Sequence, residues 1–170
     1  LLADALPIAG HLALAAFQQQ FPGRLTLITQ NVDGLHQRAG STGVLCLHGD
    51  IFEDRWLDMP RNCCHIEHAV AGHPPYCDRC GNLLRPGVVW FGEALPFRTL
   101  EAAQQAAQAC DLMLVVGTAG AVYPAAGLAH QARAAGAKVV VVNPAPSELD
   151  GTAHAVLRAS AAQVLPTLLG

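Results

Sequence analysis

The chain has 170 residues, 52% hydrophobic and 14% charged, which is enough apolar material for one domain with an insertion. Its net charge is −3 and it has no run of Lys or Arg, so we expect no nucleic-acid partner. The longest apolar runs, residues 112–116 and 139–142, are far shorter than a membrane span, and no membrane association is expected.

The first half of the chain begins with a predicted helix and two short strands. Residues 8–20 place apolar side chains at a helical period after Pro7, which suits a first helical turn. Residues 24–29 and 44–48 are short segments rich in strand-forming residues.

The second half alternates predicted helices with apolar strands. Helices are expected at residues 100–110 and 125–135, and each leads to a nearly all-apolar strand, at 111–117 and 138–143. A last helix is expected from about residue 161. Strands that are apolar on both faces are typical of covered parallel sheets, so we predict an α/β fold with a doubly wound parallel sheet.

An insertion interrupts this pattern at residues 51–84. The segment is rich in Cys, His, Pro and charge and lacks a clean period, so we expect a small module that needs a metal to hold it together. The predicted domains are therefore residues 1–50 with 85–170, and the module 51–84.

The pair Cys77-x2-Cys80 has the spacing of a zinc knuckle. Further ligands would come from a stretch with adjacent cysteines and two histidines: Cys63, Cys64, His65 and His68. Neighbouring side chains rarely both reach one metal, so one cysteine with one histidine competes with the four-cysteine set. The alternative is a vestigial site with free thiols. A metal-type spacing in place of a disulfide framework also predicts a reducing, cytoplasmic setting.

Polar residues follow the two short strands of the first half. Gln30, Asn31 and Asp33 follow one strand, and His48 ends the other. Ligands of open α/β sheets bind outside the carboxyl ends of the strands, so a functional site is expected here. The competing interpretation is a capped helix start, with Asp33 accepting hydrogen bonds from backbone donors.

Two later segments are weaker candidates. Gly117-Thr118 closes an apolar strand and suits phosphate or ribose binding by backbone N–H groups, and Asn143 ends the next strand. Residues 85–93 combine a β-rich, aromatic strand with a glycine. That strand either pairs with a peptide at a sheet edge or lies in the core.

Taken in order, these segments resemble the sirtuins, a family of NAD-dependent protein deacylases, across nearly the whole chain. The matching segments are residues 29–36, His48-Gly49, the Cys77/Cys80 pair, residues 84–86, 88–93, Gly117-Thr118, 122–126 and Asn143. Residues 88–93 and 122–126 are most similar to the bacterial and mitochondrial branch, which removes acidic acyl groups as well as acetyl.

The resemblance implies a Rossmann-like domain whose cofactors are NAD and zinc. It makes His48 and Asn31 the catalytic residues and lines the pocket for nicotinamide and its ribose with Gln30, Asn31 and Asp33. The acyl-lysine oxygen would attack the ribose C1′ as nicotinamide leaves. His48, as the general base, would then help a ribose hydroxyl take the acyl group, giving O-acyl-ADP-ribose.

The remaining roles are also implied by the resemblance. The residues expected to hold the adenosine half of NAD are Gly117, Thr118 and Asn143. Those expected to hold an acyl-lysine peptide as an added strand are Val89, Phe91, Gly92 and Glu93. The metal ligands would be Cys63, Cys64, Cys77 and Cys80, and the protein is expected to act as a monomer.

The chain departs from the family in its missing first segment, in its cysteines, and at Ala119, Ala145 and Ala159, where the family usually has other residues. The family opens with a strand and a Gly-Ala-Gly loop that cradles the NAD phosphates, whereas this chain starts at Leu1 with neither. We therefore expect a fragment with impaired activity, whose acyl-selecting residues lie upstream. Trp56 and Met59 stand where the first zinc cysteines are expected, and Cys63 and Cys64 would replace them.

Two other functions compete with NAD-dependent deacylation. One is a catalytically silent zinc-containing α/β module that binds a peptide or ADP-ribose. The other, a zinc-ribbon nucleic-acid binder, fits residues 51–84 alone and conflicts with the acidic charge balance.

Overall fold

A computed structural model describes residues 4–170. The first three residues of the predicted segment 1–50, Leu1 among them, lie outside the described part. The helices and strands are α1 (Ala9–Gln20), β1 (Ile28–Thr29), α2 (Leu35–Arg38), β2 (Leu45–Cys46), β3 (Gly49–Trp56), the 3-10 helix η1 (Ile66–His68), β4 (Leu84–Val88), α3 (Phe97–Ala109), β5 (Leu112–Val116), α4 (Gly127–Ala134), β6 (Lys138–Val142), β7 (Ala155–Leu157) and α5 (Ala161–Leu169). No helix in this part of the chain is long and apolar enough to cross a membrane.

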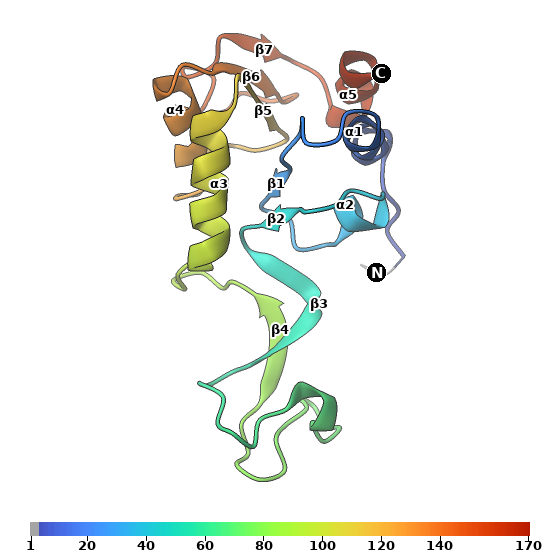
Figure 1. Ribbon diagram of the computed structural model, residues 1–170, viewed down its shortest axis with the longest axis vertical. Coiled ribbons are helices and arrows are strands. Elements are labelled where there is room, and N and C mark those ends of the chain that lie inside the picture. The colour runs from blue at the N-terminus through green and yellow to red at the C-terminus, as the bar shows by residue number, and fades with distance from the viewer. Residues whose placement is uncertain (1–3) are drawn as a thin grey trace.

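A parallel sheet of β5, β6 and β7 forms the upper part of the molecule in Figure 1, with β6 in the middle. Five consecutive residue pairs join β5 to β6, from Leu112 opposite Lys138 to Val116 opposite Val142. Helix α4 connects these strands, so β5–α4–β6 is the predicted strand–helix–strand unit. Val139, Val141 and Val142 are fully buried, as expected of a strand covered on both faces.

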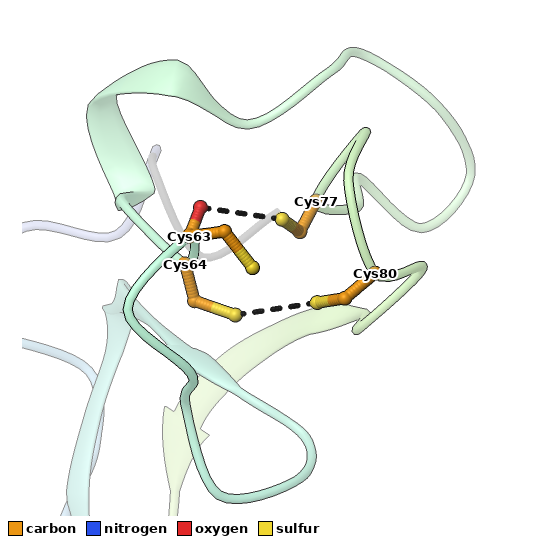
Figure 2. A group of neighbouring side chains, drawn as sticks. All are labelled: Cys63, Cys64, Cys77 and Cys80. Carbon is orange, nitrogen blue, oxygen red and sulfur yellow. Dashed lines mark hydrogen bonds between the residues drawn. The ribbon is translucent and has the colours of Figure 1, made fainter.

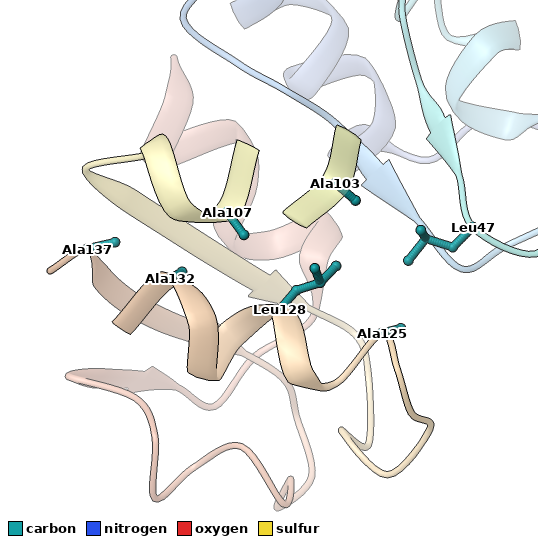
Figure 3. Close-up of a cluster of buried hydrophobic side chains, with 7 residues drawn as sticks. All are labelled: Leu47, Ala103, Ala107, Ala125, Leu128, Ala132 and Ala137. Carbon is teal, nitrogen blue, oxygen red and sulfur yellow. The ribbon is translucent and has the colours of Figure 1, made fainter. Parts of the chain in front are cut away.

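Helices cover both faces of this sheet. On one face, α3 and α4 pack small side chains closely, as Figure 3 shows for Ala103, Ala107, Leu128 and Ala132. On the other face, Leu114 and Val116 of β5 pack against the cluster formed by α1 and α5. The α/β fold with a doubly wound parallel sheet is therefore confirmed.

Strands β1 and β2 form a second, two-stranded parallel sheet, with Ile28 opposite Leu45 and Thr29 opposite Cys46. The residue after this pair, Leu47, is 1% exposed and packs in the same cluster as Ala125 and Leu128. Burying a leucine contributes about 2 kcal/mol, so this contact anchors the end of β2 beside the loop that enters α4.

Strands β3 and β4 form an antiparallel ribbon that leads away from the sheets to the cysteine-rich segment (Figure 1). Two isolated bridges, Val70 with Tyr76 and Tyr76 with Leu83, hold the far end. The predicted boundaries of the module, residues 51–84, fall within the ribbon, and the division into two domains stays a prediction.

Several predicted elements differ from the structure in length. The strands at 24–29 and 44–48 shrink to two residues each, and residues 85–93 form a strand only as far as Val88. Two strands had no clear signal in the sequence. β7 has three residues, and β3 contains Asp50, Glu53, Asp54 and Arg55. The exposed residues of β3, 52–54, are consecutive and no residue of this strand is fully buried, so it lacks the apolar alternation that would reveal it.

Candidate functional site

His48 follows β2 and is held by a backbone carbonyl group. Its Nδ1 lies 2.9 Å from the carbonyl oxygen of Gln30, the residue after β1. A carbonyl oxygen only accepts hydrogen bonds, so Nδ1 carries the proton in the neutral ring and Nε2 keeps its lone pair. The β1–β2 pairing thus places His48 so that Nδ1 contacts the Gln30 carbonyl oxygen, while the basic Nε2 takes no part in this contact.

Gly49 allows the chain to turn sharply directly after His48. Its φ is +80°, and an added Cβ would lie 1.9 Å from the carbonyl oxygen of Gly87 on β4. Only glycine fits here, because both the backbone conformation and the space exclude a side chain. The turn brings β3 against β4 and fixes the direction in which the histidine leaves the sheet.

The loop from Gln30 to Gly34 is held by short-range hydrogen bonds. Thr29 Oγ1 accepts from the Asn31 amide at 3.1 Å, and Asp33 Oδ1 accepts from the Leu35 amide at 3.0 Å. The competing interpretation of Asp33 as a helix-start residue is therefore correct for one of its oxygens. It leaves the second oxygen, Oδ2, for a ligand.

A histidine pair that was not predicted lies beside this loop. The rings of His11 on α1 and His36 on α2 have centroids 4.6 Å apart and meet edge to face. Burial lowers the pKa of both rings; Asp33 opposes this for both, and His11 lowers the pKa of His36 further. His36 Nδ1 is buried without a hydrogen-bond partner. The neutral rings therefore pack α1 against the Asp33 loop.

Gly117, Thr118 and Asn143 meet at the carboxyl ends of β5 and β6. Asn143 is buried, and its side-chain amide donates to the carbonyl oxygens of Thr118 at 3.3 Å and Ala145 at 3.0 Å. Both amide hydrogens are thus engaged, and only its Oδ1 is left for a ligand. Thr118 Oγ1 accepts from the Gly120 amide at 3.2 Å, which closes the loop.

The segment after β4 lies beside His48. The Val89 amide donates to the His48 carbonyl oxygen at 2.8 Å. Phe91 is fully exposed, whereas Glu93 forms ion pairs with Arg55 and Arg85. The network of Arg55, Arg85 and Glu93 was not predicted. An arginine in an otherwise apolar strand is a signal for it, because a buried charge needs a partner.

Figure 2 shows four cysteines that converge at the end of the β3–β4 ribbon: Cys63, Cys64, Cys77 and Cys80. Their sulfurs all lie within 4.8 Å of one another, and the sulfurs of Cys64 and Cys80 are 3.5 Å apart. Tetrahedral zinc with Zn–S bonds of about 2.3 Å holds its sulfurs roughly 3.8 Å apart, so the cluster fits that ion.

Of the two competing ligand sets, the structure brings together the four cysteines and not one cysteine with a histidine. Cys63 and Cys64 both turn toward the pair Cys77/Cys80, and neither histidine candidate is part of the group. Hydrogen bonds from the backbone, chiefly at Arg79, lower the pKa of Cys77 to about 7, whereas a hydrogen bond with Cys80 raises the pKa of Cys63. Four protein ligands leave no open position, so the site is structural.

Comparison with known proteins gives consistent matches along the chain. Residues 1–124 match the model of the Sir2 family. The chain is 53% identical over 163 residues to an NAD-dependent protein deacylase of Ralstonia nicotianae, covering 96% of the chain and 65% of that protein. It is 46% identical to an NAD-dependent protein deacylase of Mycobacterium tuberculosis, covering 99% of the chain and 72% of that protein.

Solved structures give the same result for the fold. A structure of Sir2 bound to acetylated peptide superposes with a TM-score of 0.86 at 32% identity, covering 98% of the chain and 71% of that protein. A Sir2 homologue in complex with NAD has a TM-score of 0.86 at 38% identity, covering 99% of the chain and 65% of that protein. The chain thus spans about two thirds of the length of the proteins it matches.

Proposed function

The chain belongs to the Sir2 family, and from that membership we propose that it acts in the NAD-dependent removal of acyl groups from protein lysines. The products are nicotinamide and O-acyl-ADP-ribose, and the acyl groups are acetyl and, as its branch of the family suggests, succinyl or malonyl. The observation that carries the proposal is the orientation of His48 by the Gln30 carbonyl oxygen, which leaves Nε2 as a base.

His48 is the general base of the proposed reaction. NAD supplies the ribose carbon that accepts the acyl oxygen as nicotinamide leaves. His48 Nε2 would then take the proton of a ribose hydroxyl while that oxygen attacks the acyl carbon, and the protonated lysine amine would leave from the same carbon. The hydrogen bond from Nδ1 to Gln30 supports this role, because it holds the ring in the tautomer that accepts a proton at Nε2.

Gln30, Asn31 and Asp33 form the proposed nicotinamide end of the site. Asp33 Oδ2 would accept from the carboxamide of nicotinamide, while its other oxygen is used by the Leu35 amide. Asn31, exposed at the end of β1, would contact the nicotinamide ribose as the second catalytic residue.

Gly117, Thr118 and Asn143 form the proposed adenosine end. Gly117 has a φ of +63° and open space around its Cα, which suits close approach of a ribose. Asn143 would act mainly through the two carbonyl groups that it braces.

The proposed partners are acyl-lysine proteins, bound as an added strand by the segment after β4, which contains Val89, Phe91, Gly92 and Glu93. The four-cysteine cluster would hold one zinc ion that fixes the end of the β3–β4 ribbon. We also propose that the protein acts as a monomer in the cytoplasm, where free thiols such as these remain reduced.

The test is an assay of the 170-residue chain and of the protein as encoded, each with NAD and acetyl-, succinyl- or malonyl-lysine peptides. Mass spectrometry should detect deacylated peptide, nicotinamide and O-acyl-ADP-ribose in equal amounts, and omission of NAD should abolish all three. Binding of the peptide or ADP-ribose by calorimetry without any turnover would contradict deacylation and favour a silent binding module.

A further inference from the structure

Arg85 is a charged residue in an almost fully buried position of β4. Its side chain is 7% exposed. One Nη2 hydrogen bond goes to Glu93 Oε1, and Nη1 donates to the Val88 carbonyl oxygen at 2.9 Å. The guanidinium also lies over the ring of Trp90, 4.2 Å from its centroid. These contacts are to Val88, the last residue of the strand, and to Trp90 and Glu93 in the segment that follows it.

A second arginine explains why Glu93 is needed here. Arg55 on β3 is the register partner of Arg85 on β4, and like charges placed directly opposite each other destabilise a strand pair. Arg55 Nη2 donates to Glu93 Oε2 at 2.7 Å, while Arg85 pairs with the other carboxylate oxygen. Glu93 therefore lies between two cations and neutralises their repulsion.

The Glu93 carboxylate also stabilises a tight turn of residues 90–93. Glu93 Oε2 accepts from the Trp90 amide at 2.9 Å, and the Glu93 amide donates to the Trp90 carbonyl oxygen at 3.0 Å. Gly92, with a φ of +88°, permits the tight return. The turn is joined to the proposed base because the Val89 amide donates to the His48 carbonyl oxygen at 2.8 Å.

These contacts separate the residues that the arginines hold from Phe91, which has no such contact. Glu93 and the Trp90 ring are occupied by Arg85, whereas Phe91 is fully exposed. Given the proposed function, Phe91 and the carbonyl group of Val89 would meet a peptide, since the Val89 amide is used by His48, and Glu93 acts through the arginines.

We propose that Arg85 is a positioning residue for the acyl-lysine peptide. By holding Glu93, Trp90 and the Val88 carbonyl group at once, it fixes the turn of residues 90–93 and the backbone of Val89 beside His48. This inference rests on the proposed function. Lysine is a poor substitute, because an ammonium group cannot contact a carboxylate, a carbonyl oxygen and an aromatic face in the fixed planar geometry of a guanidinium.

The test compares Arg85→Lys with Arg98→Lys, a matched control at an exposed position of α3. Arg85→Lys should raise the KM for an acyl-lysine peptide at least about tenfold, with kcat and the KM for NAD changed far less. Hydrogen exchange at the Val89 and Trp90 amides should also become faster. The control should change none of these. A merely structural role predicts equal losses for peptide and NAD, and that result would overturn the proposal.

Glu93→Gln is the second variant, in case Arg85→Lys does not fold. It keeps the shape of the side chain but removes the charge between the arginines, so the same exchange and peptide effects are expected. Hydrogen exchange needs no turnover, so it reports on the contacts of Arg85 even if the parent protein shows no deacylation, in which case the proposed function alone fails. Unchanged exchange at Trp90 in both variants contradicts the positioning role.

Discussion

The carbonyl oxygen of Gln30 lies 2.9 Å from Nδ1 of His48, so the end of β1 orients the histidine at the end of β2. A histidine held in this way can take a proton at Nε2. The departure of nicotinamide involves no proton transfer to this nitrogen. The two steps of the proposed reaction should therefore respond differently to its removal.

We expect His48→Ala to lower deacylation by at least about a hundredfold, the size of a general-base contribution, while exchange of labelled nicotinamide into NAD persists. His73→Ala, an exposed histidine of the cysteine-rich segment, should leave both rates unchanged. Equal loss of exchange and deacylation in His48→Ala, with the thermal midpoint unchanged, would place the histidine in the first step.

Gly49→Ala should be far more damaging than a glycine substitution elsewhere. Gly49 and Gly43 both have a positive φ, but an added Cβ meets the Gly87 carbonyl oxygen at Gly49 and open space at Gly43. Gly43→Ala should therefore cost only the backbone strain, about 1 kcal/mol, and Gly49→Ala roughly 2 kcal/mol or more in addition. Denaturant unfolding measures both. Equal losses of unfolding free energy in the two variants would mean that β4 can move away from the added Cβ at no energetic cost.

Zinc content should depend on both members of the adjacent cysteine pair. We expect about one zinc ion per chain, and a strong loss of zinc in Cys63→Ser and in Cys64→Ser, because each removes one of four ligands. Cys110→Ser lies outside the cluster and should retain the metal. Metal analysis after dialysis gives the result, and full zinc content in either cluster variant would exclude that cysteine as a ligand.

Stability should fall in mildly acidic solution because of the His11–His36 pair. Burial lowers the pKa of both rings below the ordinary 6.5, and the acidic group that acts on both is Asp33, which raises them in part. The unfolded chain then binds protons more readily than the folded one. The stability contributed by the neutral rings is complete above pH 6.5 and is lost as the pH falls through their lowered pKa values.

The measurement is the thermal midpoint between about pH 7.5 and 5. His36→Gln should flatten its fall, since one buried ring no longer has to stay neutral. His73→Gln should leave the slope as it is in the parent chain. An equally steep fall in the His36 variant would show that the pair does not cause it.

The order of the elements and the positions of the polar residues could be predicted from the sequence. Strand β6 is nearly all valine, and its burial on both faces makes its type and its parallel pairing clear. The strands β1 and β2 were predicted, but longer than they are, and the charged strand β3 was not, because their extent depends on their partners and not on their own apolar pattern.

The site divides in the same way. The sequence by itself determined which groups stand at the carboxyl ends of the strands: Gln30, Asn31, Asp33 and His48 on one sheet, and Gly117, Thr118 and Asn143 on the other. The spacing of Cys77 and Cys80 likewise determined half of the metal site.

The tertiary structure decided what these groups are free to do. It engaged both amide hydrogens of Asn143 and one oxygen of Asp33 in hydrogen bonds with the backbone, and it paired Glu93 with Arg55 and Arg85. It also brought both Cys63 and Cys64 to the metal site. The reason is physical: residue types follow local rules of period and spacing, whereas a hydrogen bond or an ion pair depends on which distant segment the fold brings within about 3 Å.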